Sequence, residues 1–245
     1  MSSLVKGFYC FISGIGLMFR PGIFRYAMWP LIINIIIFTL VGIVAYYQFE
    51  GLLEWMLSYL PGWLEWLRYL LWPIFALALA FIFFFTFSLL ANLVASPFNA
   101  PLAHAVEQRL GKVSDTTGSS TPFVRSVLKS VASELRKMLY ILLRAIPLLL
   151  LFVIPVVNIA APFLWIMFSA WMLTMEYADY PMGNHELDFK SQLKWLKKRR
   201  FLSLGFGATV TLALLVPVLN FLVMPAAVAG ATKMWVEDFP PIGEK

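Results

Sequence analysis

Long stretches without Asp, Glu, Lys or Arg dominate the pattern along the chain. They cover residues 26–49, 69–106, 145–175 and 201–232. A helix needs about 20 apolar residues to cross a bilayer, and the first stretch is long enough. The second holds a span between Pro73 and the segment "SPFNAP" (96–101), whose prolines are expected to end the helix. The pattern therefore predicts two long transmembrane helices within 21–106.

The third and fourth apolar stretches share a short phrase. "IPVVNIAAP" (154–162) and "VPVLNFLVMP" (216–225) both read Pro-Val-x-Asn, followed by a second proline. Repeated apolar segments interrupted by proline indicate broken helices. Each stretch is too short for two spans of about 20 residues, so it forms either one kinked span or a re-entrant hairpin. Asn158 and Asn220 are expected to cap the outgoing arms, which places positive helix ends at membrane depth.

The distribution of Lys and Arg favours hairpins over single crossings. Basic residues recur through 107–144 and again through 190–200, on either side of the third stretch. A single crossing would put these two segments on opposite sides of the membrane, against the positive-inside rule. Hairpins that enter and leave on one side keep both segments and both termini cytoplasmic. We therefore predict two long spans plus two pairs of half-penetrating helices, with a four-span chain as the alternative.

An amphipathic helix at the membrane surface is expected to precede the spans, because Val5, Phe8, Phe11 and Ile15 recur at helical spacing. The chain is thus expected to form an all-α, single membrane-embedded domain. Its predicted segments are an interfacial helix (1–20), two long spans (21–106), a basic cytoplasmic segment (107–137), a first re-entrant pair (138–178), a cytoplasmic segment (179–200) and a second re-entrant pair (201–236).

Composition agrees with a membrane location. Of the 245 residues, 61% are hydrophobic and 13% are charged, and the mean hydropathy is +0.81. In soluble domains, about 45–50% of the residues are apolar and about 25% are charged. Lys and Arg exceed Asp and Glu by 19 to 13, but they flank apolar runs, so the excess does not indicate nucleic-acid binding. Cys10 is the only cysteine, which excludes an internal disulfide and a cysteine-rich metal cluster.

The search for chemistry turns up an anion site rather than an active site. No phosphate-binding loop, Gly-x-Ser-x-Gly elbow or zinc motif is present, and His104 and His185 lack neighbouring ligands. We therefore expect no catalytic residues, no metal and no cofactor. Arg20 and Arg25 flank a Pro-Gly step where the first span begins. A helix N-terminus beside a guanidinium suits a tetrahedral oxyanion. The alternative is that both arginines anchor the chain to lipid phosphate.

Two polar segments follow apolar ones. Glu107 and Arg109 are two residues apart and do not share a helix face, so they either line an entrance or are solvated. Residues 179–185 are expected to form an ordered turn. The acidic patch around it, which includes Glu176 and Asp179, either pairs with the "KKRR" run (197–200) or couples protons.

Three longer phrases, "RPGIFRYAMWPLIINI", "SAWMLTMEYADYPMGNH" and "FGATVTLALLVPVLNFLVMPAAVAGATKMW", resemble the CysZ family of bacterial sulfate transporters. The resemblance extends from about Gly7 to Asp238. It implies sulfate uptake across the bacterial inner membrane for cysteine synthesis. It also implies an oligomer of chains with two long spans and two half-penetrating helix pairs, in contact with membrane lipids.

The resemblance also implies site residues. The family's sulfate motif, of the type Gly-Leu/Ile-Arg-Arg, corresponds here to Gly22-Ile23-Phe24-Arg25, so that Phe24 stands where the first arginine is expected. Arg20 is the candidate that replaces it. A glutamate and an arginine after the second span correspond to Glu107 and Arg109, which become candidates for the ion path with Asn158 and Asn220.

Other functions remain open at this point. The chain is either a sulfate transporter, passive or proton-coupled, or a membrane scaffold or assembly factor without transport activity. A lipid-modifying enzyme is the third reading, and it would depend on Glu107, Asp179 or His185.

Overall fold

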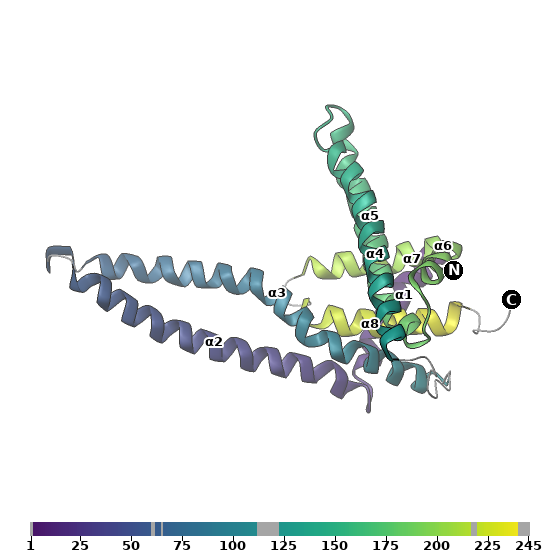
Figure 1. Ribbon diagram of the computed structural model, residues 1–245, viewed down its shortest axis with the longest axis horizontal. Coiled ribbons are helices and arrows are strands. Elements are labelled where there is room, and N and C mark those ends of the chain that lie inside the picture. Colours follow the sequence, from purple (N-terminus) through teal and green to yellow (C-terminus); the bar gives the residue numbers. More distant parts are fainter. Residues whose placement is uncertain (1, 60–61, 65, 112–122, 217–219, 240–245) are drawn as a thin grey trace. The chain divides into compact units, whose positions relative to one another are not determined.

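The computed structural model describes residues 2–59, 62–64, 66–111, 123–216 and 220–239, with side chains throughout except at 52, 56–57, 64, 68, 80, 82–96, 123–131 and 220–221. All regular structure in these ranges is helical (Figure 1). The elements are α1 (Ser3–Met18), α2 (Phe24–Ser58), η1 (Gly62–Leu64), α3 (Leu67–Arg109), α4 (Phe123–Leu151), η2 (Val157–Ile159), α5 (Ala161–Asn184), α6 (Phe189–Lys198), α7 (Arg200–Leu214) and α8 (Asn220–Asp238). The prediction of an all-α chain is confirmed for the described residues.

The chain divides into two compact units, which we describe separately. The smaller unit, Met28–Phe98, contains most of α2 and α3. Aromatic side chains join the two helices: the rings of Phe49 and Phe75 stack at 3.6 Å, and Trp72 lies edge-on to Phe49. Among the described residues, Phe24–Trp55 is the one helical stretch long and apolar enough to cross a membrane. The second expected span falls largely on 82–96, whose side chains lie outside the described residues.

The larger unit, residues 1–27 and 99–245, is built around α1, α5, α7 and α8. Helix α1 packs against α7 and α8 with very close backbone contacts. A Cβ atom on Gly7 would collide with the backbone of Leu202 and Phe206, and one on Gly14 would collide with Ala226 and Gly230. Small residues permit this approach between apolar helices. The core of this unit includes Cys10, Met18, Met175, Met182, Phe206, Val210 and Met234.

Polar contacts also join α1 to α8. Lys6 forms a 2.5 Å salt bridge with Asp238, and Lys233 donates to the Ser13 hydroxyl at 2.9 Å. The expected N-terminal helix is therefore present, but one of its faces is buried against protein. The opposite face exposes large apolar side chains, among them Leu4, Val5, Phe8, Tyr9, Ile12, Ile15 and Phe19.

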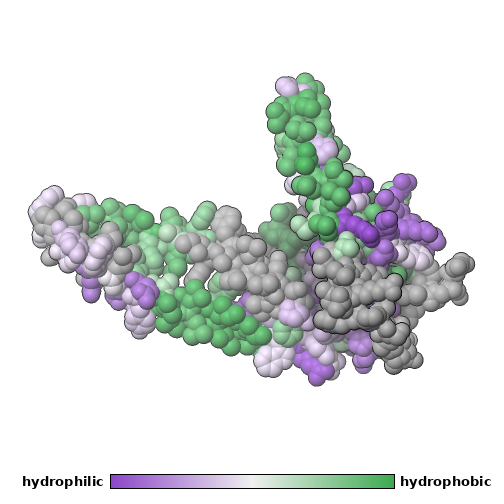
Figure 2. Space-filling view, in the orientation of Figure 1, coloured by the Kyte–Doolittle hydropathy of each residue, from purple (hydrophilic) through white to green (hydrophobic). Residues whose placement is uncertain are grey.

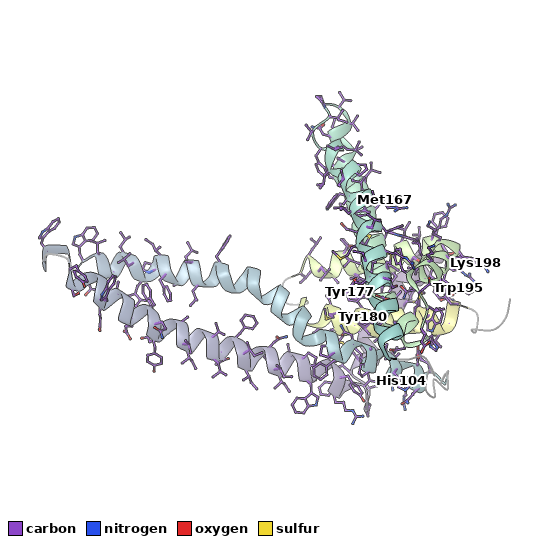
Figure 3. The ribbon with its side chains drawn as sticks, in the orientation of Figure 1. His104, Met167, Tyr177, Tyr180, Trp195 and Lys198 are labelled. Carbon is purple, nitrogen blue, oxygen red and sulfur yellow. The ribbon has the colours of Figure 1, made fainter. Side chains whose placement is uncertain are left out.

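Helices α4 and α5 form an antiparallel hairpin whose two ends differ in character. Near α6, Lys137 and Thr174 are buried. Toward the connecting turn, apolar side chains are exposed, and Val153 and Val156 reach 79% and 81%. Figure 2 shows the hydrophobic surface of this end, and Figure 3 marks Met167 on it. The first Pro-Val-x-Asn phrase therefore makes a chain reversal, as its repeated prolines indicate.

Three expectations about helix ends are wrong. Helix α3 continues through "SPFNAP" to Arg109, and α5 continues through 179–184, where a turn was expected. In both places buried side chains hold the proline-containing helix together, Asn99 and Leu102 in α3 and Met182 in α5. Proline removes one backbone hydrogen bond, and packing of the neighbouring turns compensates for that loss.

The third wrong expectation concerns Asn158. It lies in η2 and does not cap α5, whose N-cap is Ala160. The backbone of Asn158 instead bonds to Ile154, because the chain turns after Val156, where φ is 69°. For the second hairpin, α7 ends at Leu214 and α8 begins at Asn220. The capping role expected of the Asn220 side chain lies outside the described residues.

Candidate anion site and buried polar pairs

The predicted anion motif forms a tight turn between α1 and α2. Gly22 has φ of +87°, a conformation that residues with a side chain rarely adopt. The N–H groups of Ile23 and Phe24 both donate to the Arg20 carbonyl, at 3.1 and 3.0 Å. Ile23 is 2% exposed and fixes the turn to the core. Gly22 is thus needed for backbone geometry, and the N–H groups of Ile23 and Phe24 are already engaged.

The arginine side chains at this turn are exposed. The Arg25 guanidinium lies 4.8 Å from the centre of the Tyr26 ring and donates to the Tyr26 hydroxyl at 3.0 Å. A guanidinium has five N–H donors, so Arg25 has donors beyond the one given to Tyr26. Phe24, at the position where the family motif has its first arginine, is 43% exposed and faces the Phe19 ring at 6.1 Å. The turn therefore gathers Arg20, Gly22, Ile23, Phe24 and Arg25 in one short segment.

Glu107 is not solvated, contrary to one of the two roles considered for it. It is 2% exposed and lies 3.1 Å from Nε2 of His185, whose side chain is 9% exposed. The imidazole packs against Trp235 of α8 with 5.6 Å between ring centres. Nδ1 of His185 is buried without a hydrogen-bond partner in the described part of the chain. A buried carboxylate and imidazole thus meet where α3 and α5 end.

A second contact closes the same junction. Asn184 donates to the carbonyl of Ala100 at 3.0 Å and so joins the ends of α5 and α3 again. Arg109 is exposed at the end of α3, so it does not share the environment of Glu107. His104 lies on α3 beside Gln108, 3.0 Å away (Figure 3). Asn158 is exposed in the turn of the first hairpin, and the structure does not bring it to Glu107 or to Arg109.

Lys137, whose side chain is buried, organises a second polar cluster. Its ammonium lies 2.8 Å from Glu176 and 3.0 Å from Asp179, and the Gln192 amide donates to the other oxygen of Asp179 at 2.6 Å. Burial opposes the charge of Lys137, but the attraction of Asp179 and Glu176 outweighs it and raises the pKa of Lys137. For Glu176 and Asp179, the alternative of pairing with "KKRR" is wrong, because the fold places Lys137 against both carboxylates.

Sequence reasoning did not identify His185 as the partner of Glu107, or Lys137 as the partner of Asp179. These partners are 78 and 42 residues apart along the chain. For Lys137, the sequence offered one weak signal of a buried ion pair: this lysine stands at the polar start of an otherwise apolar helix. Within the described residues, no group of three or more His, Cys, Asp or Glu side chains is placed to hold a metal ion.

Comparison with known proteins assigns a family to this arrangement. Residues 10–225 match the family model described as "Sulfate transporter CysZ/Etoposide-induced protein 2.4". A protein named "Sulfate transporter CysZ" from Pseudomonas fluorescens (strain Pf0-1) is 42% identical over 227 residues, which cover 92% of this chain and 91% of that relative. One of the same name from Vibrio atlanticus (strain LGP32) is 42% identical over 238 residues, covering 96% and 93%. A third, from Pseudomonas aeruginosa (strain LESB58), is 39% identical over 227 residues, covering 92% of each chain.

Proposed function

The chain belongs to the family of sulfate transporter CysZ and etoposide-induced protein 2.4, and on that premise we propose that it carries sulfate across the bacterial inner membrane for cysteine synthesis. The relatives are named as sulfate transporters, and the resemblance found in the sequence points the same way. The exposed arginine turn before α2 is the observation that carries the proposal, because it offers guanidinium donors beside the long apolar helix Phe24–Trp55.

In the proposal, sulfate binds at the turn through the side chains of Arg25 and Arg20. The backbone N–H groups of Ile23 and Phe24 already donate to Arg20, so the guanidinium groups supply the charge-assisted hydrogen bonds. The Tyr26 hydroxyl holds the Arg25 side chain in place. The approach to the turn at Gly22 is open, since a Cβ atom placed there would have no neighbour within 4 Å.

The proposed membrane arrangement has two long spans, α2 and α3, and two half-penetrating pairs, α4–α5 and α7–α8. Helix α7 contains 15 residues, about 22 Å at helical rise, which is less than the hydrocarbon thickness of about 30 Å. The exposed apolar turn of α4–α5 is suited to lipid or to another copy of the chain. The proposal includes a homo-oligomer, since backbone that ends within the bilayer needs protein or water around it.

The proposed ion path includes the exposed Arg109 at the end of α3, whereas Glu107 is buried against His185 and acts beside the path rather than as a donor to the anion. Sulfate is doubly charged and strongly hydrated, so its path must be lined by donors and must release it again. In a proton-coupled mechanism, the pair Glu107–His185 would carry the proton, because it joins a carboxylate to an imidazole in a buried setting.

Labelled-sulfate uptake into liposomes containing the full chain tests the proposal. Uptake above empty liposomes supports transport, and acceleration by an inward proton gradient supports coupling. Arg25→Ala removes charged hydrogen bonds worth about 1.5–3 kcal/mol, so sulfate affinity should fall about tenfold or more. Arg136→Ala is the matched control, since Arg136 is an exposed arginine of α4. Absence of uptake by well-folded protein would favour the scaffold function.

A gain-of-affinity variant sharpens the site assignment. Phe24→Arg restores the second arginine of the family motif at a position that is 43% exposed, so packing should tolerate it. We expect sulfate to bind about tenfold more tightly, through added charge-assisted hydrogen bonds. The measurement is isothermal titration of the detergent-purified protein. Unchanged affinity in both Phe24→Arg and Arg25→Ala would remove the turn from the sulfate site.

A further inference from the structure

Helix α6 presents four lysines on one face. Lys190, Lys194, Lys197 and Lys198 stand at positions i, i+4, i+7 and i+8 of this helix, and all four are exposed. Residues at this spacing share a helix face. Figure 2 shows the hydrophilic surface that gathers over α6, and Figure 3 labels Lys198 and Trp195 on it. We call these four residues the lysine stripe.

The lysine stripe is held rigidly outward. Asp188 caps α6 by accepting from the Ser191 backbone at 3.3 Å and from its hydroxyl at 2.6 Å. Phe189, Gln192 and Leu196 on the opposite face are buried, and Gln192 is tied to Asp179 of α5. The helix therefore cannot turn its lysines inward without losing this packing.

Within the described ranges, none of the four lysines forms an ion pair with a carboxylate, while Lys137, Lys6 and Lys233 each do so. Like charges four residues apart, as in Lys190–Lys194 and Lys194–Lys198, destabilise a helix. A cluster that the fold holds together against its own repulsion is suited to an external anionic partner.

Apolar surface adjoins the stripe. The Lys198 ammonium lies 5.4 Å from the centre of the Trp195 ring, and Arg200 lies over Phe201 at 5.0 Å. Phe201 is 52% exposed and begins the apolar run of α7. A partner that covers both surfaces needs an anionic group next to hydrocarbon.

We propose that the lysine stripe of α6, bordered by Trp195 and Phe201, is a binding site for anionic phospholipid headgroups. The lysines meet the phosphates, and the adjoining aromatic rings lie at the level where headgroup and acyl chain join. A soluble anion would satisfy the charges but not the apolar border. The site is separate from the arginine turn, and it does not depend on sulfate transport.

Lipid selectivity of the full-length protein in bilayers tests this inference. The protein is reconstituted in phosphatidylcholine with trace spin-labelled phosphatidylglycerol or phosphatidylcholine, and the motionally restricted fraction of each label is measured. Wild type should prefer phosphatidylglycerol. Removing one lysine near the surface should lower that preference about fivefold, so Lys194→Gln/Lys197→Gln should abolish most of it. High salt should have the same effect through screening.

Two matched variants make the result specific. Arg109→Gln/Arg136→Gln removes the same net charge from two exposed residues outside α6 and should retain the preference. Lys194→Arg/Lys197→Arg keeps the charge and should also retain it. Circular dichroism of each variant confirms the fold. Equal losses in the two glutamine variants, displacement of the lipid by millimolar inorganic phosphate, or no preference in wild type would each overturn the proposal.

Discussion

The side chains of the α4–α5 hairpin are mostly exposed near its turn, whereas those of α7 and α8 are largely buried. Both hairpins carry the Pro-Val-x-Asn phrase in the sequence between their arms, yet the surroundings of the arms differ. The difference lies in the arms. Helices α7 and α8 place Gly205, Gly207 and Gly230 against the backbones of α1 and α5. The turn-proximal arms of α4–α5 instead carry Leu, Ile and Phe, which suit contact with lipid or with another subunit.

The two hairpins also differ in the contacts that hold their arms. Helices α7 and α8 are held by close apolar contact with α1, including the edge-on rings of Phe11 and Phe206 at 6.3 Å. Helices α4 and α5 are joined to each other at their base by the ion pairs of Lys137 with Glu176 and Asp179. Substitutions that distinguish close packing from ion pairing should therefore affect the two hairpins separately.

The largest expected effect is at Gly14. In Gly14→Val the side chain would collide with the backbone of Ala226 and Gly230, so α1 should detach from α8 at a cost of about 3 kcal/mol, the upper end of the usual range for overpacking. Burial raises the pKa of the Cys10 thiol to about 11 and keeps it unreactive. Maleimide labelling of this single cysteine should therefore become much faster.

Gly16→Val is the control on the same helix, because a Cβ atom on Gly16 has no neighbour within 4 Å. It carries the same change in helix propensity, a gain below about 1 kcal/mol, because Val favours a helix more than Gly does. Slow labelling in both variants would show that the close contact between α1 and α8 does not hold the N-terminal helix.

An intermediate effect is expected at the base of the first hairpin. Lys137→Gln leaves Glu176 and Asp179 without their cation, and the free energy of unfolding should fall by about 2 kcal/mol. This loss in the free energy of unfolding is smaller than the loss on breaking a fully buried ion pair, because the side chains of Glu176 and Asp179 are 50% and 32% exposed. Thermal unfolding in detergent measures it.

Arg136→Gln, at the neighbouring exposed position, should change the free energy of unfolding by less than about 0.5 kcal/mol. If both variants unfold at the wild-type temperature, the hairpin base is held by its apolar contacts and not by the ionic cluster.

The smallest effect is expected at the turn of the first hairpin. Val153 is 79% exposed, so Val153→Ser should leave the unfolding temperature in detergent within about 1 °C of wild type. Size-exclusion chromatography of the same samples should show the wild-type assembly. A clear loss of stability or a smaller assembly would mean that this turn is buried against another copy of the chain.

Local sequence signals predicted the reversal in the first hairpin and the helix at the N-terminus, because prolines and apolar periodicity act within a few residues. They failed where distant packing decides. Pro181 and the "SPFNAP" prolines were expected to end helices, yet buried neighbours such as Asn99 and Met182 keep the helices continuous. Proline weakens a helix locally, and the sequence does not reveal which turns will be buried.

In the candidate site, too, local backbone features could be predicted from the sequence and contacts between distant residues could not. The special backbone at Gly22 could be anticipated from a Pro-Gly step beside two arginines. The burial of Glu107 could not, because its partner His185 belongs to another helix and is 78 residues away. Spacing along one helix excludes a contact between Glu107 and Arg109, but it does not choose among partners elsewhere in the chain. The prediction that Asn158 caps α5 is wrong because the N-cap is Ala160, two residues further along the chain.

The packing of α1 against α7 and α8 has a consequence for synthesis of the protein. Helix α1 leaves the ribosome long before α8, which carries Asp238. The face of α1 that holds Cys10 and Gly14 therefore stays uncovered until α8 has been made. Contacts between sequence-distant segments form slowly, and uncovered apolar faces favour aggregation. The contacts of α1 with α8 can therefore form only after nearly all of this unit has been made, and α1 keeps an uncovered apolar face until then.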